Sequence, residues 1–349
     1  MSKLRIAVIF GGCSTEYDVS LKSAYSVITH LDTEKYQPVL LGITRSGEWY
    51  LYKGPYENIA NDTWLNPQYC TSAIISPNRE TQGILAVTGG ITKVISLDAA
   101  LPILHGKNGE DGTIQGLLLM AGIPVVGCGI LASALCMDKD KAHKLVEAAG
   151  VRVPQSFTID CESQTDMALA KAESLGFPLF VKPIKSGSSF GVTKVMDKHE
   201  LPLAIKIAFE HDNEVIIEEN IDGFEVGCAI IGNQHLIVGQ LDEVELSEGF
   251  FDYKEKYNLE TSQIHVPARI APQKAEEIKQ VAKLIYLALG CSGFARVDMF
   301  LTPSGEVLFN EVNTIPGFTT HSRFPNMLKA IGMTFEQILD EIIKQAVGM

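Results

Sequence analysis

The stretch from Gly293 to Asn313 constrains the fold of this chain more than any other, because it reads as a β-hairpin whose pairing can be worked out residue by residue. Two apolar, strand-like runs flank Pro303-Ser304-Gly305, which is a turn signal. If Ser304-Gly305 forms a two-residue loop, strand alternation places four polar side chains on one face. They form two directly opposed pairs, Asp298 with Glu311 and Arg296 with Asn313.

Two opposed carboxylates repel each other, so this face requires a cation. The donors are oxygen atoms, with no Cys or His among them, and such donors suit Mg²⁺, with Mn²⁺ as a substitute. An arginine beside the metal indicates stabilisation of a developing anion, as in phosphoryl transfer. The alternative is an amphipathic hairpin with a solvated charged face, and the hairpin alone does not exclude it.

Composition narrows the class of protein. The chain has 349 residues, 46% of them hydrophobic and 20% charged, which is typical of a globular protein with two or three domains. A net charge of −13 argues against nonspecific binding to nucleic acid. The 7 cysteines are scattered and form no CxxC pair, which favours free thiols in a reducing cytoplasm. No apolar run predicts a signal peptide or a membrane span.

The first 130 residues predict a doubly wound α/β domain. Leu4–Phe10 and Gln37–Thr44 are strand-like, and Val19–Leu31 between them has helical spacing, which is a βαβ start. Further strands are expected at Ile95–Leu104 and Ile123–Val126, with a helix at 112–121. Residues 51–94 are rich in turn signals, and their elements cannot be assigned from the sequence.

The rest of the chain predicts two α+β domains, at residues 131–215 and 216–349. Helices are expected at 137–149, 201–210, 272–289 and 335–347. Strands are expected at 177–183, 192–196, 214–220, 224–231 and 235–241, besides the hairpin.

The second informative motif is a strand that ends in Lys182 and is followed by a loop rich in glycine and serine, residues 184–191. Glycines let the backbone approach a ligand closely, so that successive N–H groups bind phosphate, and Lys182 adds a positive charge. The spacing is not that of a P-loop. An ordinary flexible hairpin is the alternative.

Two further motifs are weaker alone. A strand that ends in Glu218-Glu219, followed by Ile221 and Glu225, could offer acceptors to an adenine and to ribose hydroxyls, or could be an acidic surface. Residues 104–113 follow a strand and open a helix, at the edge where open α/β sheets bind ligands. Glu110 and Asp111 in this segment could merely favour the start of the helix.

Taken together and in order, these motifs resemble the D-alanine–D-alanine ligase family of the ATP-grasp superfamily, over nearly the whole chain. The markers are 11–12 with 16–20, 105–106 with 110–112, 137–139, 182–183 with 187–189, 296–298, and 311–317. The resemblance implies an ATP-grasp fold with the ATP site between the last two domains. It also implies that one D-amino acid is activated by ATP as an acyl phosphate and then joined to the amine of a second.

The family's functional residues map onto this sequence one by one. The resemblance implies two Mg²⁺ ions on Asp298, Glu311 and Asn313, and oxyanion stabilisation by Arg296 and the Gly317 N–H. For ATP it implies contacts from Lys139, Lys182, Ser188, Ser189, Glu218, Glu219, Ile221, Glu225 and Lys256. Glu16 would bind the first substrate's ammonium, with His105 nearby, and Ser322 with Lys256 would bind phosphate and the second substrate's carboxylate. Glu16, Ser188 and Tyr257 would hold a mobile loop shut, which keeps water from the acyl phosphate.

Departures from the family pattern bear on the second substrate. Arg323 follows Ser322, where D-alanine–D-alanine ligases usually carry Leu or Met, and Phe251 stands where Tyr is common. Arginine is costly beside a bare methyl group but useful beside a hydroxyl, and Asp242 could orient it. Tyr257 is retained, which argues against D-lactate. The sequence is therefore most like the D-alanine–D-serine ligases of vancomycin resistance.

Two alternatives stay open: a housekeeping D-alanine–D-alanine ligase, and a noncatalytic nucleotide-binding module. The substrates are expected to be D-alanine and D-serine. The resemblance also implies a homodimer, and neither nucleic acid nor membrane is an expected partner.

Overall fold

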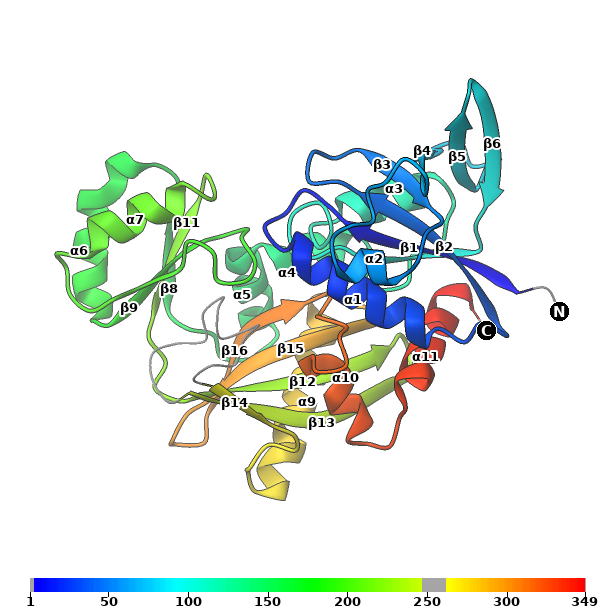
Figure 1. Cartoon of the computed structure of the whole chain (residues 1–349). Helices are drawn as coiled ribbons and strands as arrows, with labels where there is room; N and C mark the ends of the chain where they lie inside the picture. The colour runs from blue at the N-terminus through cyan, green and yellow to red at the C-terminus, as the bar shows by residue number, and fades with distance from the viewer. Residues whose placement is uncertain (1–2, 247–261, 349) are drawn as a thin grey trace.

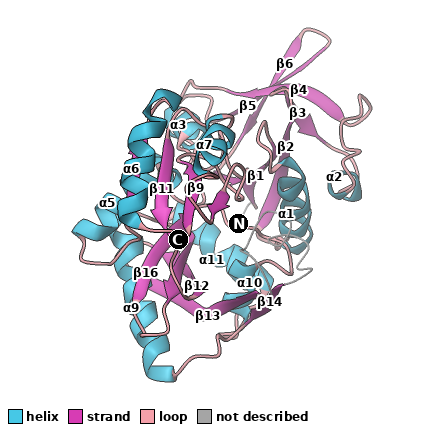
Figure 2. Ribbon diagram, turned by 90° about the vertical axis from the view of Figure 1, so that its left-hand side faces the viewer, coloured by secondary structure: helices cyan, strands magenta, loops and turns pink. Residues whose placement is uncertain are grey.

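The computed structural model describes residues 3–246 and 262–348, which form three sheets with their covering helices (Figure 1). The three sheets follow one another along the chain, and each corresponds to one domain. Figure 2 shows the same molecule turned by 90°.

The N-terminal sheet is mixed, with strand order β6-β5-β4-β3-β2-β1-β7. β1 (Leu4–Gly11) runs parallel to β2 (Tyr36–Ile43) and β7 (Ala99–Ile103). The remaining strands are antiparallel, namely β3 (Trp49–Tyr52), β4 (Cys70–Ile75), β5 (Gly83–Thr88) and β6 (Ile91–Ser96). The helices are α1 (Tyr17–His30), α2 (Glu57–Ala60) and α3 (Thr113–Met120).

Both faces of β1 are buried, as its unbroken apolar run predicts. Val8 packs in the cluster that contains α1, whereas Ile9 packs in the cluster that contains α3. The sequence expectation needs two corrections here. Residues 123–126 make only an isolated bridge, from Val125 to Ala100, and residues 95–104 divide between β6 and β7.

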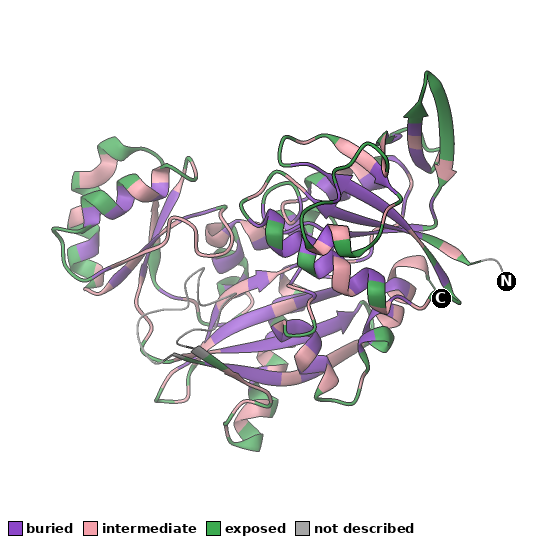
Figure 3. Cartoon of the chain, in the orientation of Figure 1, coloured by how far each residue is buried: buried purple, intermediate pink, exposed green. Residues whose placement is uncertain are grey.

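Residues 51–94, which the sequence does not assign, form the antiparallel part of this sheet. The hairpin of β5 and β6 extends away from the body, and most of β6 is exposed (Figure 3). Because few of its side chains are buried, β6 lacks the apolar alternation by which a strand is found in a sequence.

The central sheet is antiparallel, in the order β10-β9-β11-β8. Its strands are β8 (Ser156–Ile159), β9 (Leu179–Pro183), β10 (Thr193–Val195) and β11 (Val215–Glu219). One face is covered by α6 (Thr165–Leu175) and α7 (Leu201–Phe209), with a 3₁₀ turn at Glu162–Gln164. Val181 and Ile217 point to those helices, so Lys182 and Glu218 lie on the opposite, open face.

The C-terminal sheet has the order β14-β13-β12-β15-β16 and is antiparallel throughout. Its strands are β12 (Phe224–Gly232), β13 (Leu236–Leu246), β14 (Ser262–His265), β15 (Phe294–Leu301) and β16 (Val307–Asn313). One face packs on α4 (Ile130–Met137), α5 (Lys139–Ala148) and α9 (Pro272–Ala288). On the other face, the side chains at one end of the strands are apolar, and they pack against α10 (Arg323–Lys329) and α11 (Phe335–Val347).

The domain boundaries expected from the sequence need adjustment. β11 pairs with β8 and β9, so the central unit extends past residue 215 to Glu219. α4 and α5 pack on the C-terminal sheet rather than on the central one, through side chains such as Ala132 and Val146. The sequence predicted α5, but it predicted neither α4 nor the sheet that the apolar faces of these two helices cover.

Candidate active site

The β15–β16 hairpin has the predicted pairing, although it reaches that pairing in a different way. Arg296 pairs with Asn313 and Asp298 with Glu311. The turn holds three residues, since Thr302 and Glu306 are the last hydrogen-bonded pair before it. An irregularity between Asp298 and Met299 then leaves Asn310 as an extra residue on β16. The longer turn and the bulge compensate, so the four polar residues keep the expected partners.

Arg296 and Asn313 both bind the Asp298 carboxylate. Arg296 Nε lies 2.8 Å from Asp298 Oδ1, and its Nη2 lies 2.6 Å from Oδ2. Asn313 Nδ2 donates to Asp298 Oδ2 at 2.9 Å and lies 3.5 Å from Glu311 Oε1. Burial opposes the charge on Arg296, but the Asp298 carboxylate outweighs it, and the pKa of Arg296 is raised.

These residues fit a hard divalent cation by their donor chemistry. Asp298 and Glu311 supply carboxylate oxygens. The amide nitrogen of Asn313 lies against an oxygen of each carboxylate, which is the position that a cation bound by both would take. Turning the amide over would present its oxygen instead. Within residues 3–246 and 262–348, no group of three or more His, Cys, Asp or Glu side chains is arranged to hold a metal.

Arg323, at the start of α10, lies beside this hairpin and is buried. Its Nε and Nη2 bind the two carboxylate oxygens of Asp242 at 2.6 and 2.8 Å, and its Nη1 binds Glu225 at 2.5 Å. Nη2 is also 3.4 Å from Asp298 Oδ1. Burial opposes the charge, but the carboxylates raise the pKa of Arg323 further above its ordinary value. The ion pair expected between Asp242 and Arg323 is therefore present.

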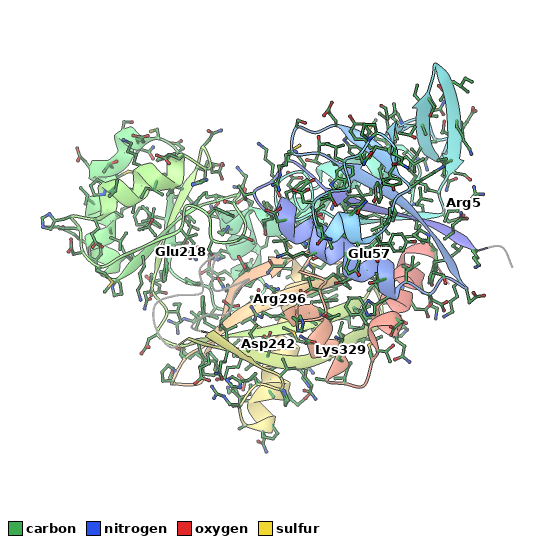
Figure 4. The ribbon with its side chains drawn as sticks, in the orientation of Figure 1. Arg5, Glu57, Glu218, Asp242, Arg296 and Lys329 are labelled. Atoms are coloured by element: carbon green, nitrogen blue, oxygen red, sulfur yellow. The ribbon has the colours of Figure 1, made fainter. Side chains whose placement is uncertain are left out.

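A cavity of about 530 Å³ separates the central and C-terminal sheets. Most of the residues expected to bind ATP line it: Lys139, Lys182, Ser189, Glu218, Glu219, Ile221 and Glu225. Glu311 reaches it from β16. Figure 4 labels Glu218 on one side, and Arg296 and Asp242 on the sheet opposite. A volume of this size is in the range of small-ligand sites.

Two of the lysines expected to bind ATP line the cavity. Lys182 Nζ is 2.5 Å from Glu218 Oε2, and Lys139 Nζ donates to the Ser186 carbonyl at 2.7 Å. Burial disfavours the Glu218 carboxylate, but Lys182 more than offsets this and lowers the pKa of Glu218. The other oxygen, Oε1, is buried with no hydrogen-bond partner among the described residues, so it is an acceptor that a ligand donor could satisfy.

The N-terminal domain contributes Glu16 and His105. Ser188 donates a hydrogen bond to Glu16, so the glycine- and serine-rich loop contacts the N-terminal domain as expected. His105 is buried and lies within hydrogen-bond distance of Ile315 and Ser23. Its pKa is lowered, first by burial.

Gly317 and Ser322 lie close together in the segment before α10. A Cβ atom at Gly317 would be 3.0 Å from Ser322 Oγ, which itself binds the Thr319 backbone N–H at 3.0 Å. Gly317 therefore packs against the turn at 319–322 that leads into Arg323.

Several lining residues were not identified from the sequence. Phe180, Lys194, Glu243 and Arg269 line the cavity. Arg269 Nη2 pairs with Glu243 Oε1 at 2.7 Å. For Glu110 the sequence left open that it merely favours a helix start, and its carboxyl group accepts the Ile315 N–H from the C-terminal domain at 2.9 Å. The sequence signal that could have identified Glu110 as a site residue was its place in the ordered set of family motifs.

Three expected site residues, Phe251, Lys256 and Tyr257, lie outside the described residues. Among the residues that are described, no helix is long and apolar enough to cross a membrane.

Comparison with known proteins decides the family. The model described as "D-ala D-ala ligase N-terminus" matches residues 5–128, and that of "D-ala D-ala ligase C-terminus" matches residues 145–344. The chain belongs to the D-alanine–D-alanine ligase family. The predicted ATP-grasp fold and ligase class are confirmed.

Relatives in this family differ in their second substrate. The crystal structure of the VanG D-Ala:D-Ser ligase from Enterococcus faecalis is 56% identical, with a TM-score of 0.92, covering 99% of this chain and 100% of that chain. A putative D-alanine–D-lactate ligase of Streptomyces coelicolor is 44% identical, over 99% of this chain and 98% of that protein. A D-alanine–D-alanine ligase of Caldicellulosiruptor bescii is 41% identical, over 99% and 96%. The resemblance to the vancomycin-resistance ligases is confirmed, but overall identity to the family does not decide the second substrate.

Proposed function

We propose that this enzyme joins D-alanine to D-serine at the expense of ATP. The observation that carries the proposal is Arg323, which is buried on Asp242 and Glu225 beside the polar face of the hairpin. The likeness to the VanG ligase supports it. The product would form an altered terminus on peptidoglycan precursors and thereby weaken vancomycin binding.

The reaction proceeds in two steps. The carboxylate of D-alanine attacks the γ-phosphate of ATP, which gives D-alanyl phosphate and ADP. The amine of D-serine then attacks the acyl carbon, a proton is lost from nitrogen, and inorganic phosphate leaves. Water must be excluded because it would hydrolyse the acyl phosphate.

The residues of this chain hold and polarise the reactants. Lys139 and Lys182 bind the phosphates, while Glu218, Glu219, Ile221 and Glu225 accept the adenosine. Glu16 binds the ammonium of D-alanine, near His105. Arg296 and the Gly317 N–H stabilise the tetrahedral oxyanion. Ser322 and Lys256 bind the carboxylate of the second substrate and the phosphate, and Tyr257 closes the site with Glu16 and Ser188.

Asp298, Glu311 and Asn313 would hold Mg²⁺ ions, two in number, which neutralise the charge of the phosphates when bound. This assignment is part of the proposal. It is supported by the all-oxygen donor set and by the close approach of the three side chains.

The physical reason for D-serine is hydrogen-bond selectivity. A guanidinium has five N–H donors. The described residues take three hydrogen bonds from Arg323, which leaves donor capacity beside the second substrate. A site built to bind a hydroxyl rejects an analogue that lacks it by about 10⁴-fold or more, whereas an apolar pocket discriminates weakly.

The deciding experiment is product analysis with ATP, Mg²⁺ and equal amounts of D-alanine and D-serine. We expect mostly D-alanyl-D-serine from the parent enzyme. Arg323→Leu alone would leave Asp242 buried and unpaired, so it is compared with Arg323→Leu combined with Asp242→Asn, which keeps an acceptor for the Gly227 N–H. Both variants should shift toward D-alanyl-D-alanine.

Arg152→Leu is the matched control, because Arg152 pairs with Glu306 at the surface. Its product ratio should equal that of the parent. If the parent itself makes mainly D-alanyl-D-alanine, the enzyme is a D-alanine–D-alanine ligase and the D-serine proposal is wrong.

We also propose that the enzyme works as a homodimer in the cytoplasm. Its seven free cysteines support a reducing compartment, and sedimentation measurements would test the dimer.

A further inference from the structure

A hydrogen-bond relay, half-buried at Glu110 and buried at His105 and Ser23, joins the N-terminal domain to the segment that contains Gly317. Glu110 is its first member. One oxygen of its carboxyl group accepts the Gly106 N–H at 2.9 Å, and the other accepts the Ile315 N–H at 2.9 Å. One carboxyl group thus binds backbone from both domains.

His105 binds the same residue, Ile315, through the carbonyl of the next peptide unit. Its Nδ1 lies 2.8 Å from the Ile315 carbonyl oxygen, which can only accept, so Nδ1 carries the proton. Its Nε2, 3.3 Å from Ser23 Oγ, must then accept from that hydroxyl. Burial lowers the pKa of His105, in keeping with a neutral ring.

Ser23 completes the relay on the far side of Gly317. Its Oγ accepts the Phe318 backbone N–H at 3.2 Å while its hydroxyl hydrogen points to His105. Ser23 is fully buried in α1, and Phe318 is fully buried in the shared apolar cluster. Donors and acceptors alternate consistently along the whole relay.

We propose that Ser23, His105 and Glu110 are positioning residues that fix the backbone on both sides of Gly317. The inference rests on the proposed function, in which the Gly317 N–H stabilises the tetrahedral oxyanion. Ile315 is bound through its N–H and its carbonyl, and Phe318 through its N–H. The peptide that precedes Gly317 therefore has little freedom to turn.

Fixing this peptide matters because a preorganised donor stabilises the transition state without reorganisation as charge develops. Removal of one such donor costs about 10²–10³-fold in kcat. Misplacement of the donor by loss of the relay should therefore lower kcat by about 10-fold to 10²-fold. ATP binds between the other two sheets, so its affinity should change by less than about 3-fold.

The first test does not depend on turnover. Hydrogen exchange of the Ile315 and Phe318 amides is followed in the nucleotide-free full chain. Glu110→Ala should speed exchange at Ile315, and Ser23→Ala at Phe318, each by at least about 10-fold. Glu110→Gln, whose amide oxygen accepts at one of the two positions only, should lie between parent and Glu110→Ala.

Asp111→Ala is the matched control. The Asp111 carboxylate also accepts two backbone N–H groups, but both are its neighbours along the chain: Asn108 in the same loop and Thr113 at the start of α3. Exchange at residues 315–318 should be unchanged in this variant. Parent-like exchange at Ile315 and Phe318 in both Glu110→Ala and Ser23→Ala would overturn the proposal.

The second test separates positioning from a general loss of folded enzyme. A phosphinate analogue of the dipeptide, whose tetrahedral phosphorus carries an oxygen in the oxyanion position, is used as inhibitor. In Glu110→Ala and Ser23→Ala it should bind at least about 10-fold more weakly while the KM for ATP stays the same. Equal binding of the analogue by parent and variants would also overturn the proposal.

The two proposals fail in different ways. If the parent ligates no pair of D-amino acids, the proposed function is wrong, yet the exchange experiment still reports on the relay. If the parent is an active ligase and both tests give parent-like results, only the relay is wrong. If Glu110→Ala does not fold, both tests are made with Ser23→Ala alone, by amide exchange at Phe318 and by binding of the analogue.

Discussion

At the scale of single residues, the site is a set of buried charges that compensate one another. Arg323 is shared by Asp242 and Glu225, while Lys182 pairs with Glu218 across two strands. Breaking such a pair by removing one partner costs about 3–5 kcal/mol, because the remaining charge stays buried. Variants of these residues should therefore be designed as charge-compensated pairs.

Glu110 gives a prediction for the pH dependence of stability. Burial, and next the nearby Glu16 carboxylate, raise the pKa of Glu110 to about 8 from its ordinary value of 4.5. Between these values the folded state holds a proton that the unfolded chain has released, so stability is lost as the pH rises toward 8.

In urea unfolding, the free energy of unfolding of the parent should therefore fall more between pH 5.5 and pH 8.5 than that of Glu110→Gln, whose side chain does not titrate. Asp111→Asn serves as control and should follow the parent. Parallel curves for parent and Glu110→Gln would show that Glu110 is ionised in the folded protein.

At the scale of elements, the β15–β16 hairpin depends on a bulge. Asn310 is the extra residue that restores the pairing of Asp298 with Glu311 after a three-residue turn. Because side chains alternate along a strand, a shift of one residue moves Glu311 and Asn313 to the opposite face.

Deletion of Val312, which lies between the two, should therefore abolish ligase activity, by at least about 10³-fold, because it makes Glu311 and Asn313 neighbours, which lie on opposite faces in any register. Asn310→Ala keeps the residue count and should retain activity within about 10-fold. Comparison of initial rates at saturating ATP tests this. An active Val312-deletion variant would mean that Glu311 and Asn313 need not lie on the same face.

At the scale of the whole molecule, α11 joins the N-terminal and C-terminal domains. Its buried side chains belong to a cluster that also contains α1, β1, β12 and α10 (Figures 1 and 3). The same cluster packs beneath the backbone segment that contains Gly317, through Phe318. The relative placement of the two domains thus rests on ordinary apolar packing.

Ile342 is fully buried in α11, so its replacement tests how much this contact contributes to the free energy of unfolding. Ile342→Ala should lower the free energy of unfolding by about 2–5 kcal/mol, from lost burial and a residual cavity. Leu203→Ala, at a position 64% exposed on α7, should change it by less than about 1 kcal/mol. Denaturant unfolding followed by circular dichroism provides the measurement. Equal effects would show that the α11 contact contributes little.

The sequence by itself determined the parts of the site that depend on neighbours along the chain. Period-two alternation placed Asp298 and Glu311 on one face, and the strand before the glycine-rich loop placed Lys182 at its end. Even there, the predicted pairing arises differently from the prediction, because the turn has one residue more than expected and a bulge on β16 compensates for it. The family motifs supplied most of the remaining site residues, which line one cavity.

Only the tertiary structure decided which distant groups meet. Glu110 and Ile315 are 205 residues apart in sequence, and no local pattern connects them. The same holds for Arg323 with Asp242, which the resemblance suggested but only the fold brought to hydrogen-bond distance. Periodicity says which face of an element is covered, but what covers it depends on how all three sheets pack, and that is a property of the whole chain.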